Sequence, residues 1–246
     1  MRPVTAMIIG LMLGVAVLSS LAEAQTSLDK MFKTLKDATG KTEGSSPGSA
    51  NVAQGLKEAL RVGTEKAVSR TSQTDGFFSN PLIKIVMPEK FQSIEKGLRL
   101  AGHGSTVDEF VLSMNRAAEA ASPQAKQIFV NAITSMSFAD ANKIFQGGDT
   151  AATDFFKEKT STDLYNSFRP VVDSNLDKVG TVQKYNSLVG QAKKVPFMKS
   201  RNLDVGEYVT NKALDGLFRV VAEEEKGIRT NPAARVTPLL KQVFGQ

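Results

Sequence analysis

The sequence predicts a single, irregular all-α domain of about ten mostly short helices, with at most one short strand or hairpin. Apolar residues recur with a helical period of about 3.6 residues over most of the chain from residue 50 onwards. Short turns rich in Gly, Pro, Ser and Asp separate the periodic segments. The chain has 246 residues, of which 41% are apolar, so it can bury a core without disulfides or metals.

The ends of the expected helices follow from local signals. Proline at the first helical position begins one helix at Pro123, and Ser137 begins another with an acidic residue three positions later. Asp149 and Asp204 are expected to cap two further helices, the second of which is long. Pro170 is expected to end a short helix, because the residue before a proline disfavours the helical conformation.

One segment has the pattern of a strand, and the remaining periodic segments have the pattern of helices. Residues 83–87, with the sequence Ile-Lys-Ile-Val-Met between two turns, form the one credible strand. We expect helices over residues 51–70, 89–101, 106–121, 123–136, 138–146, 150–159, 163–168, 171–179, 182–194, 204–228 and 232–244.

The N-terminal residues have the pattern of a cleavable signal peptide. Arg2 precedes an apolar run that is too short to span a bilayer, and the run ends in the small-residue site Ala22-Glu23-Ala24. We therefore expect cleavage after Ala24 and a periplasmic or secreted protein, without a transmembrane segment after cleavage. The chain then divides into a signal peptide (1–24), a flexible N-terminal arm (25–49) and the all-α domain (50–246).

The composition excludes several classes of site. The chain has no cysteine and one histidine, His103, so cysteine nucleophiles, thiolate metal sites and metal sites with two histidines are impossible. A Ser-His-Asp triad would need His103 as its base. We expect no metal and no cofactor, because the chain lacks the acidic spacing of a calcium loop. Gly97 and Gly102 match only the glycine spacing of a phosphate-binding loop.

The last long helix carries a carboxylate on its most apolar stripe. At about 100° per residue, Glu224 falls in line with apolar residues on one side of the helix, while other apolar residues cover a second side, so the helix should occupy the centre of the bundle. The residues in line with Glu224 are Val209, Ala213, Leu217, Val220 and Ile228, and those on the second side are Leu214, Phe218 and Val221.

A buried Glu224 must be paired or have a raised pKa. It is either a catalytic or ligand-binding acid or one half of a structural ion pair. Glu223 and Glu225 point to opposite sides, and we expect them at the surface. The candidate partners of Glu224 are Arg116, Arg229 and Arg235.

A second polar group lies on the helix expected over residues 106–121. Asn115, Arg116 and Glu119 place an amide, a guanidinium and a carboxylate within five residues. These side chains could bind a polar ligand. They could equally bridge two helices by hydrogen bonds.

Two loops combine aromatic and basic residues. Phe77 and Phe78 lie in a turn, and residues 193–201 surround apolar residues with four cations. One interpretation is contact with an anionic surface, because each Lys or Arg near an anionic leaflet contributes about 1 kcal/mol. The other is that one Phe of each loop covers the core. In the basic loop the candidates are Lys193, Lys194, Phe197, Lys199 and Arg201.

Several short motifs, specific in combination, resemble those of a known family. The chain resembles the bacterial domain-of-unknown-function family 4197 over about residues 50–245, and it has Met87-Pro88 where many relatives have Leu-Pro. The resemblance implies an exported helical protein of unassigned activity, and it implies no catalytic residues. The motifs are Leu56-Lys-Glu-Ala-Leu60, Gly76-Phe-Phe-Ser-Asn80, Asn115-Arg-Ala-Ala-Glu119, Ala222-Glu-Glu-Glu225, Ile228-Arg229, Asn231-Pro232, Arg235 and Val243-Phe-Gly245.

The sequence favours a non-enzymatic binding or scaffold protein with an apolar groove between helices. The partner would be a lipid, another apolar or anionic small molecule, or an envelope surface, to which the formal net charge of +6 would contribute. We expect no nucleic-acid partner. One alternative is a protein of the membrane surface that uses the basic and aromatic loops, and another is an enzyme that uses carboxylates such as Glu119 and Glu224.

Overall fold

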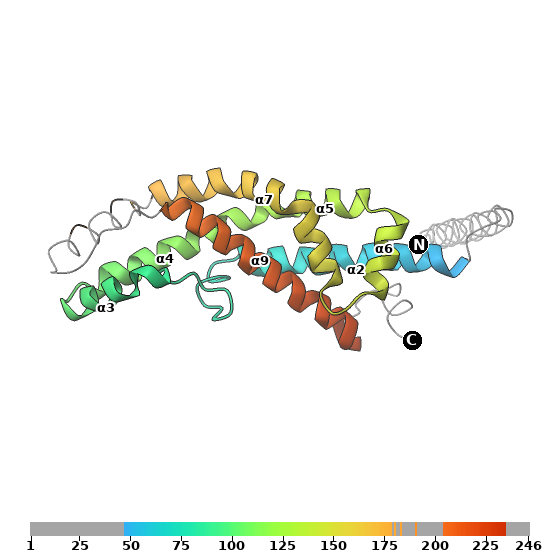
Figure 1. Ribbon diagram of the computed structural model, residues 1–246, viewed down its shortest axis with the longest axis horizontal. Helices are drawn as coiled ribbons and strands as arrows, with labels where there is room; N and C mark the ends of the chain where they lie inside the picture. The colour runs from blue at the N-terminus through green and yellow to red at the C-terminus, as the bar shows by residue number, and fades with distance from the viewer. Residues whose placement is uncertain (1–46, 179, 181–182, 184–189, 191–203, 235–246) are drawn as a thin grey trace, which may run out of the picture. The chain divides into compact units, whose positions relative to one another are not determined.

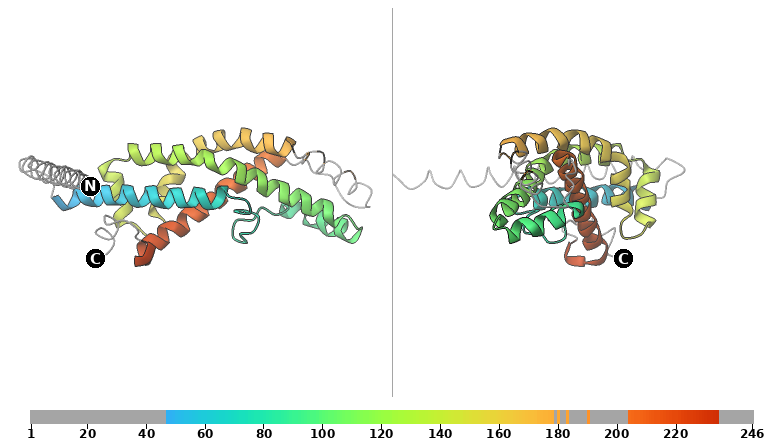
Figure 2. Two further views of the ribbon diagram at one scale, coloured as in Figure 1. Left: turned by 180° about the vertical axis from the view of Figure 1, so that it is seen from behind. Right: turned by 60° about the vertical axis from the view of Figure 1, so that its left-hand side comes forward.

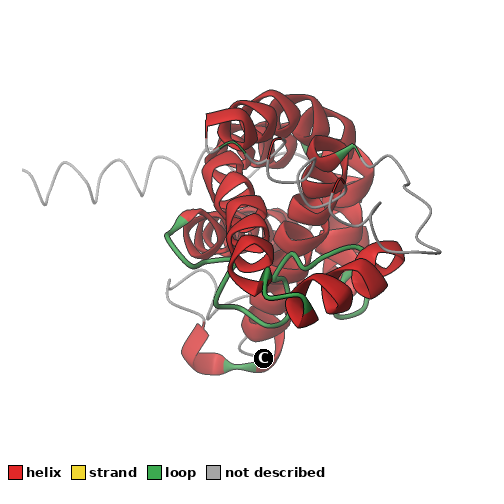
Figure 3. Ribbon diagram, turned by 90° about the vertical axis from the view of Figure 1, so that its left-hand side faces the viewer, coloured by secondary structure: helices red, strands yellow, loops and turns green. Residues whose placement is uncertain are grey.

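The computed structural model describes residues 47–178, 180, 183, 190 and 204–234, and these belong, from Gly48 onwards, to one compact unit. All their regular structure is helical, and none of the described residues forms a strand (Figure 3). The α-helices are α2 (Pro47–Ser72), α3 (Gln92–Leu100), α4 (Gly104–Ala121), α5 (Ala125–Ser135), α6 (Phe138–Gln146), α7 (Ala151–Lys178) and α9 (Val205–Thr230), and the 3-10 turns are η1 (Glu89–Phe91), η2 (Ser122–Gln124) and η3 (Pro232–Ala234).

The all-α fold class is therefore confirmed, whereas the count of about ten helices is not. The expected strand at residues 83–87 is wrong, since this segment is a loop between α2 and η1. The three short helices expected between residues 150 and 179 are wrong as well, because they are one helix, α7, with Pro170 inside it. Most of the helix expected at 182–194 and most of that expected at 232–244 lie outside the described residues.

The sequence of α7 has the pattern of three short helices because its buried residues do not follow one straight stripe along the helix. They recur every four residues, so the buried stripe shifts around the helix by about 40° at each step. Helix α7 accordingly contacts α6, α5, α4 and α9, and it bends along its course (Figures 1 and 2). Pro170 is exposed, so its missing N–H removes one helical hydrogen bond without disturbing the core. The buried positions at this spacing are Ala152, Phe156, Thr160, Leu164, Phe168, Val172 and Leu176, and Thr153 in the first turn is buried as well.

Helix α9 occupies the centre of the bundle, as the sequence predicts. It runs obliquely past α7 and α4 and contacts both (Figure 1). An aromatic cluster joins it to α5 and α7: the ring of Phe129 meets Phe156 at 5.0 Å and Phe218 at 6.3 Å between centroids, both edge to face. Its buried apolar residues include Val209, Ala213, Leu214, Leu217, Phe218, Val220, Val221 and Ile228.

Two of the predicted caps are present in the structure. The Ser137 side chain accepts from the Asp140 N–H, and the Asp140 carboxylate accepts from the Ser137 N–H, which makes a reciprocal capping box at α6. The Asp204 carboxylate accepts from the Glu207 N–H at 2.8 Å at the start of α9. That hydrogen bond is the main reason that the pKa of Asp204 lies below its usual value. Arg169 of α7 also donates to Asp204, at 3.0 Å, and so joins α7 to the first turn of α9.

Two glycines within helices have opposite surroundings. A Cβ on Gly216 of α9 would lie 2.5 Å from the Phe77 ring and 3.1 Å from Ile83, so the absence of a side chain there lets the 73–88 loop approach α9. A Cβ on Gly63 of α2 would lie 3.5 Å from Ile228, which is ordinary van der Waals contact.

We predict that the same substitution at these two glycines changes stability in opposite directions. Gly63→Ala should stabilise the protein by about 0.5–1 kcal/mol, the usual gain in helix propensity. Gly216→Ala should destabilise it by about 1–2 kcal/mol, because overpacking against Phe77 exceeds that gain. Urea unfolding followed by circular dichroism measures both. A stabilised Gly216→Ala protein would show that the loop does not pack on α9 as described.

Candidate functional site

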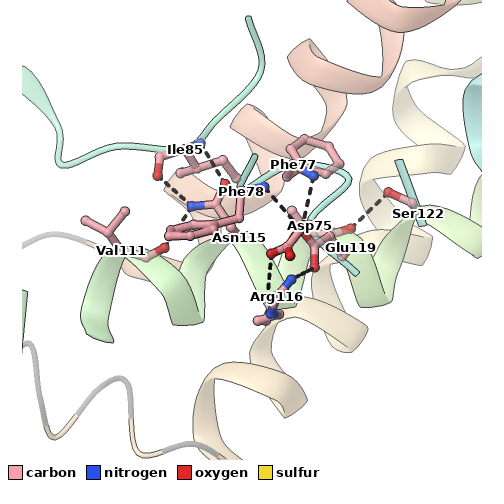
Figure 4. A network of polar contacts seen from close by, with 10 residues as sticks. Asp75, Phe77, Phe78, Ile85, Val111, Asn115, Arg116, Glu119 and Ser122 are labelled. Atoms are coloured by element: carbon pink, nitrogen blue, oxygen red, sulfur yellow. Dashed lines mark hydrogen bonds and ion pairs between the residues drawn. The ribbon is translucent and has the colours of Figure 1, made fainter. Parts of the chain in front are cut away.

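The 73–88 loop is held against α4 by a buried amide. Asn115 is fully buried, and its side-chain oxygen accepts from the Ile85 N–H at 2.9 Å. Its side-chain nitrogen donates to the carbonyls of Ile85 and Val111, both at 2.8 Å (Figure 4). The Asn115 amide thus pairs with the peptide groups of Ile85 in both directions, as a neighbouring strand would. This is why residues 83–87 have the sequence pattern of a strand and yet belong to no sheet.

A buried carboxylate holds the preceding turn of the same loop. Glu119 is 4% exposed, and its Oε1 accepts from the N–H groups of Phe77 at 3.1 Å and Phe78 at 3.2 Å. Arg116 donates to Glu119 Oε2 at 2.6 Å and to Asp75 at 2.7 Å (Figure 4). The hydrogen bond to Glu119 is the main cause of the raised pKa of Arg116.

The structure therefore brings Asn115, Arg116 and Glu119 together, as a brace between α4 and the loop. Their oxygens and donors are engaged with the loop's backbone and with Asp75. This arrangement matches the interpretation that the three side chains bridge elements of the fold. It leaves less support for the alternative in which they bind a polar ligand.

The aromatic residues of the loop have different surroundings. Phe77 is fully buried, so the interpretation in which it contacts an anionic surface is wrong, and the other interpretation holds for it, because it covers the core against Gly216. Phe78 is half-buried, and the Lys84 ammonium lies 4.0 Å from the centre of its ring. The other candidates for such a surface lie outside the described residues, as does Arg235: they are Lys193, Lys194, Phe197, Lys199 and Arg201.

Glu224 does not have the position expected for it. Its side chain is 18% exposed and pairs with Arg70 of α2 at 2.7 Å, and Arg70 also contacts Glu223 at 3.2 Å. Arg70 is itself 44% exposed. The expected partners Arg116 and Arg229 pair with other carboxylates. The Glu224 hydrogen bond is the main cause of the raised pKa of Arg70. Glu224 thus joins α9 to the last turn of α2 at the rim of the core.

The buried carboxylate is its neighbour, Glu225, whose expected surface position is wrong. The side chain of Glu225 is 6% exposed. It accepts from the N–H groups of Ala152 and Thr153, both at 2.9 Å, and from the Thr153 hydroxyl at 2.8 Å. Arg229 donates to Glu225 at 3.0 Å and to the Ile144 carbonyl at 2.8 Å.

These contacts make Glu225 and Arg229 a clamp on two helix ends. Glu225 binds the first turn of α7, where free N–H groups and the helix dipole favour a negative charge. Arg229 binds the Ile144 carbonyl in the last turn of α6, where a positive charge is favoured. Two residues one turn apart on α9 therefore fix the turn between α6 and α7.

The sequence does contain a pattern that predicts a buried Glu225, although the stripe that contains Glu224 is the more apolar of the two. Leu214, Phe218 and Val221 form the second apolar side of α9, and Glu225 continues it four residues after Val221. Arg229 follows four residues later, at the spacing of a helical ion pair. Near its C-terminal end α9 turns this side towards α7, and the stripe of Glu224 faces the end of α2.

A small hollow lies beside the clamp, between α2 and the last turns of α9. This α2–α9 hollow encloses about 20 Å³, room for one water molecule or a group of similar size. Its polar lining residues are engaged, since the Thr64 hydroxyl donates to the Leu60 carbonyl at 2.7 Å and Glu225 holds the start of α7. It is lined by Leu56, Ala59, Leu60, Gly63, Thr64, Ala152, Phe156, Val221, Glu225, Ile228 and Arg229.

Comparison with known proteins identifies the class of the chain. A family model described as "Protein of unknown function (DUF4197)" matches residues 46–245. The chain therefore belongs to the DUF4197 family, and the resemblance seen in the sequence is confirmed. No curated protein and no solved structure matches the chain. Among the described residues, no helix has both the length and the apolar character needed to cross a bilayer.

We predict that Glu225 contributes more to stability than its two acidic neighbours. Glu225→Ala removes the acceptor of two backbone N–H groups and a hydroxyl, which should cost roughly 3–5 kcal/mol. Glu223→Ala, at a half-buried site whose ion pair to Arg70 is largely solvated, should stay within about 0.5 kcal/mol, with Glu224→Ala between the two. Urea unfolding of the three variants decides the order. Equal, small losses would contradict the clamp.

We predict that Glu119 holds the 73–88 loop locally. In Glu119→Gln, one neutral oxygen replaces the carboxylate, so amide exchange at Phe77 and Phe78 should accelerate by at least tenfold. Asp75→Asn is the control, because it removes only the exposed ion pair to Arg116 and leaves both backbone hydrogen bonds. Hydrogen exchange measured by NMR reports each amide. Unchanged exchange in Glu119→Gln would refute the brace.

Proposed function

We propose that the protein is an exported, non-enzymatic binding or scaffold protein, and that the α2–α9 hollow accepts an apolar group of its partner. The observation that carries the proposal is the lining of the hollow. Eight of its eleven residues are apolar or glycine, and the oxygens of Glu225 are occupied by the start of α7. Burial of an apolar group against such a lining is favourable, whereas a polar group would find few hydrogen-bond partners there.

The size of the hollow indicates what kind of group it takes. About 20 Å³ is far below the volume of a site that encloses a whole small molecule. The hollow therefore suits an apolar side chain presented by a polypeptide better than a whole lipid. A helix that presents such side chains at intervals of three or four residues is the usual partner of a groove between helices.

The two alternatives from the sequence have less support. General acid–base catalysis needs a carboxylate that can exchange a proton with a substrate, whereas the oxygens of Glu119 and Glu225 accept from backbone N–H groups and an arginine. The membrane-surface alternative relied partly on Phe77, which is buried. Export is supported by the signal-peptide pattern of residues 1–24.

We predict that a side chain placed in the hollow blocks binding of an apolar probe. The dye ANS is too large to be enclosed, so it should bind the wild-type protein at one saturable site with only a ring edge in the hollow, and Ala59→Met should weaken this binding at least tenfold by filling the space. Methionine is suitable because its flexible side chain fits irregular gaps. The matched control is Ser69→Met, at an exposed position of the same helix.

Fluorescence titration measures both affinities, and circular dichroism checks that each variant is folded. Equal affinity in wild type and Ala59→Met would place the dye elsewhere. Absence of saturable binding in every variant would reject the hollow as a binding site.

A further inference from the structure

We propose that two copies of this chain associate through residues 84–88 of the 73–88 loop, which pair in antiparallel fashion with the same residues of the second copy. This inference goes beyond the proposed function and uses a surface other than the hollow. Residues 84–88 have no helix or turn. From Ile83 to Met87 the side chains alternate between buried and less buried positions, which is the period of an extended chain.

One edge of this extended segment is already paired inside the chain. The N–H and the carbonyl of Ile85 both bond the side chain of Asn115, so both groups point towards α4 (Figure 4). The peptide bonds of residues 84–86 are trans, and in a trans peptide the carbonyl of one residue points opposite to the N–H of the next. The Lys84 carbonyl and the Val86 N–H therefore both point away from α4, side by side. These two groups form the outer edge of the segment.

The outer edge offers one hydrogen-bond acceptor and one donor. Among the described residues, neither the Lys84 carbonyl nor the Val86 N–H has a hydrogen-bond partner. Val86 is 51% exposed, so the edge reaches the surface. The neighbouring groups are occupied, since the Lys84 N–H donates to the Asn80 carbonyl at 2.8 Å and the Val86 carbonyl accepts from the Tyr208 hydroxyl at 2.9 Å. The outer edge is therefore closed after two groups.

A second copy of the chain fits this edge because the two groups are self-complementary. When the copy is turned by 180°, the Val86 N–H of each chain faces the Lys84 carbonyl of the other. This gives two hydrogen bonds across a two-fold axis beside Ile85. A parallel copy in register would place like groups opposite each other. A longer strand from another protein gains less here, because the next groups are already bonded to Asn80 and Tyr208.

The side chains beside the outer edge are compatible with the same pairing. Leu82 and Val86 are two of the four large apolar side chains that are exposed among the described residues. In the antiparallel pair Val86 lies opposite Lys84 of the other copy, so no like charges are directly opposed. The Lys84 ammonium lies 4.0 Å from the centre of the Phe78 ring in its own chain. Because so short an edge buries much less than about 1,000 Å², the association is weak.

Sedimentation equilibrium of the full chain, up to about millimolar concentration, measures this association. We expect a monomer–dimer equilibrium. Val86→Pro removes the donor of both hydrogen bonds, and proline is tolerated at an extended edge position, so the dimer should weaken at least about tenfold. The matched control, Val86→Thr, retains the N–H and a β-branched side chain and should associate as wild type does. A monomer at every concentration overturns the proposal, as does association of Val86→Pro equal to that of wild type.

Disulfide formation between copies tests the register of the pairing. The chain has no cysteine, so any disulfide must join introduced residues. Positions 84 and 86 of opposite copies would have Cα atoms about 5.5 Å apart, within reach of a disulfide, whereas two identical positions would be about 9 Å apart. A mixture of Lys84→Cys and Val86→Cys chains should therefore form the 84–86 disulfide at least about fivefold more than either variant alone forms its own.

The matched control mixes Ser79→Cys, at an exposed position of the same loop, with Val86→Cys. This mixture should show no preference for a disulfide between the two variants. Mass spectrometry of the cross-linked peptides identifies each pair of positions. Equal yields of the 84–84, 86–86 and 84–86 disulfides overturn the two-fold pairing. A dimer in sedimentation without a preferred 84–86 disulfide overturns it in favour of another interface.

Discussion

Burial of α9 on two of its sides is the constraint on which the rest of the structure depends. Apolar side chains from these two sides contribute to one core with α4, α5 and α7. A helix packed in this way forces its neighbours to end and turn close to it. Each turn brings backbone N–H and C=O groups out of regular hydrogen bonding, and such groups need partners when water is excluded.

The buried polar side chains meet this requirement. Glu225 binds the start of α7, Glu119 binds the turn at Phe77 and Phe78, and Asn115 binds both peptide groups of Ile85. Each side chain comes from a rigid helix and reaches a segment distant in sequence. The polar residues that first suggest a catalytic or ligand site are therefore occupied in joining elements of the fold. This is why the proposed function rests on the apolar hollow and not on a polar cluster.

The sequence predicts the elements with a regular period well and misses those that depend on tertiary contacts. The position of α9 and its Asp204 cap follow from local pattern. By contrast, the sequence pattern does not show that α7 is one helix. Its buried residues recur every four positions and contact several neighbouring helices, so they do not form a single apolar face. The choice between Glu224 and Glu225 required knowing that the end of α9 faces α2 on one side and α7 on the other. The loop at residues 83–87 has a strand pattern because a side chain, Asn115, replaces the missing strand.

The same packing explains why a hollow can exist beside so dense a core. On α2 the positions that face the end of α9 are small, at Ala59 and Gly63, and Ala59 packs with Ile228 as a pair separate from the main cluster. The clamp of Glu225 and Arg229 fixes the α6–α7 turn beside this pair without needing large apolar side chains to fill the space. The small side chains of α2 thus leave the hollow open at the edge of the core, between α2 and the last turns of α9. Under the proposed function, an apolar group that enters it would add buried apolar area beside Ala59 and Ile228.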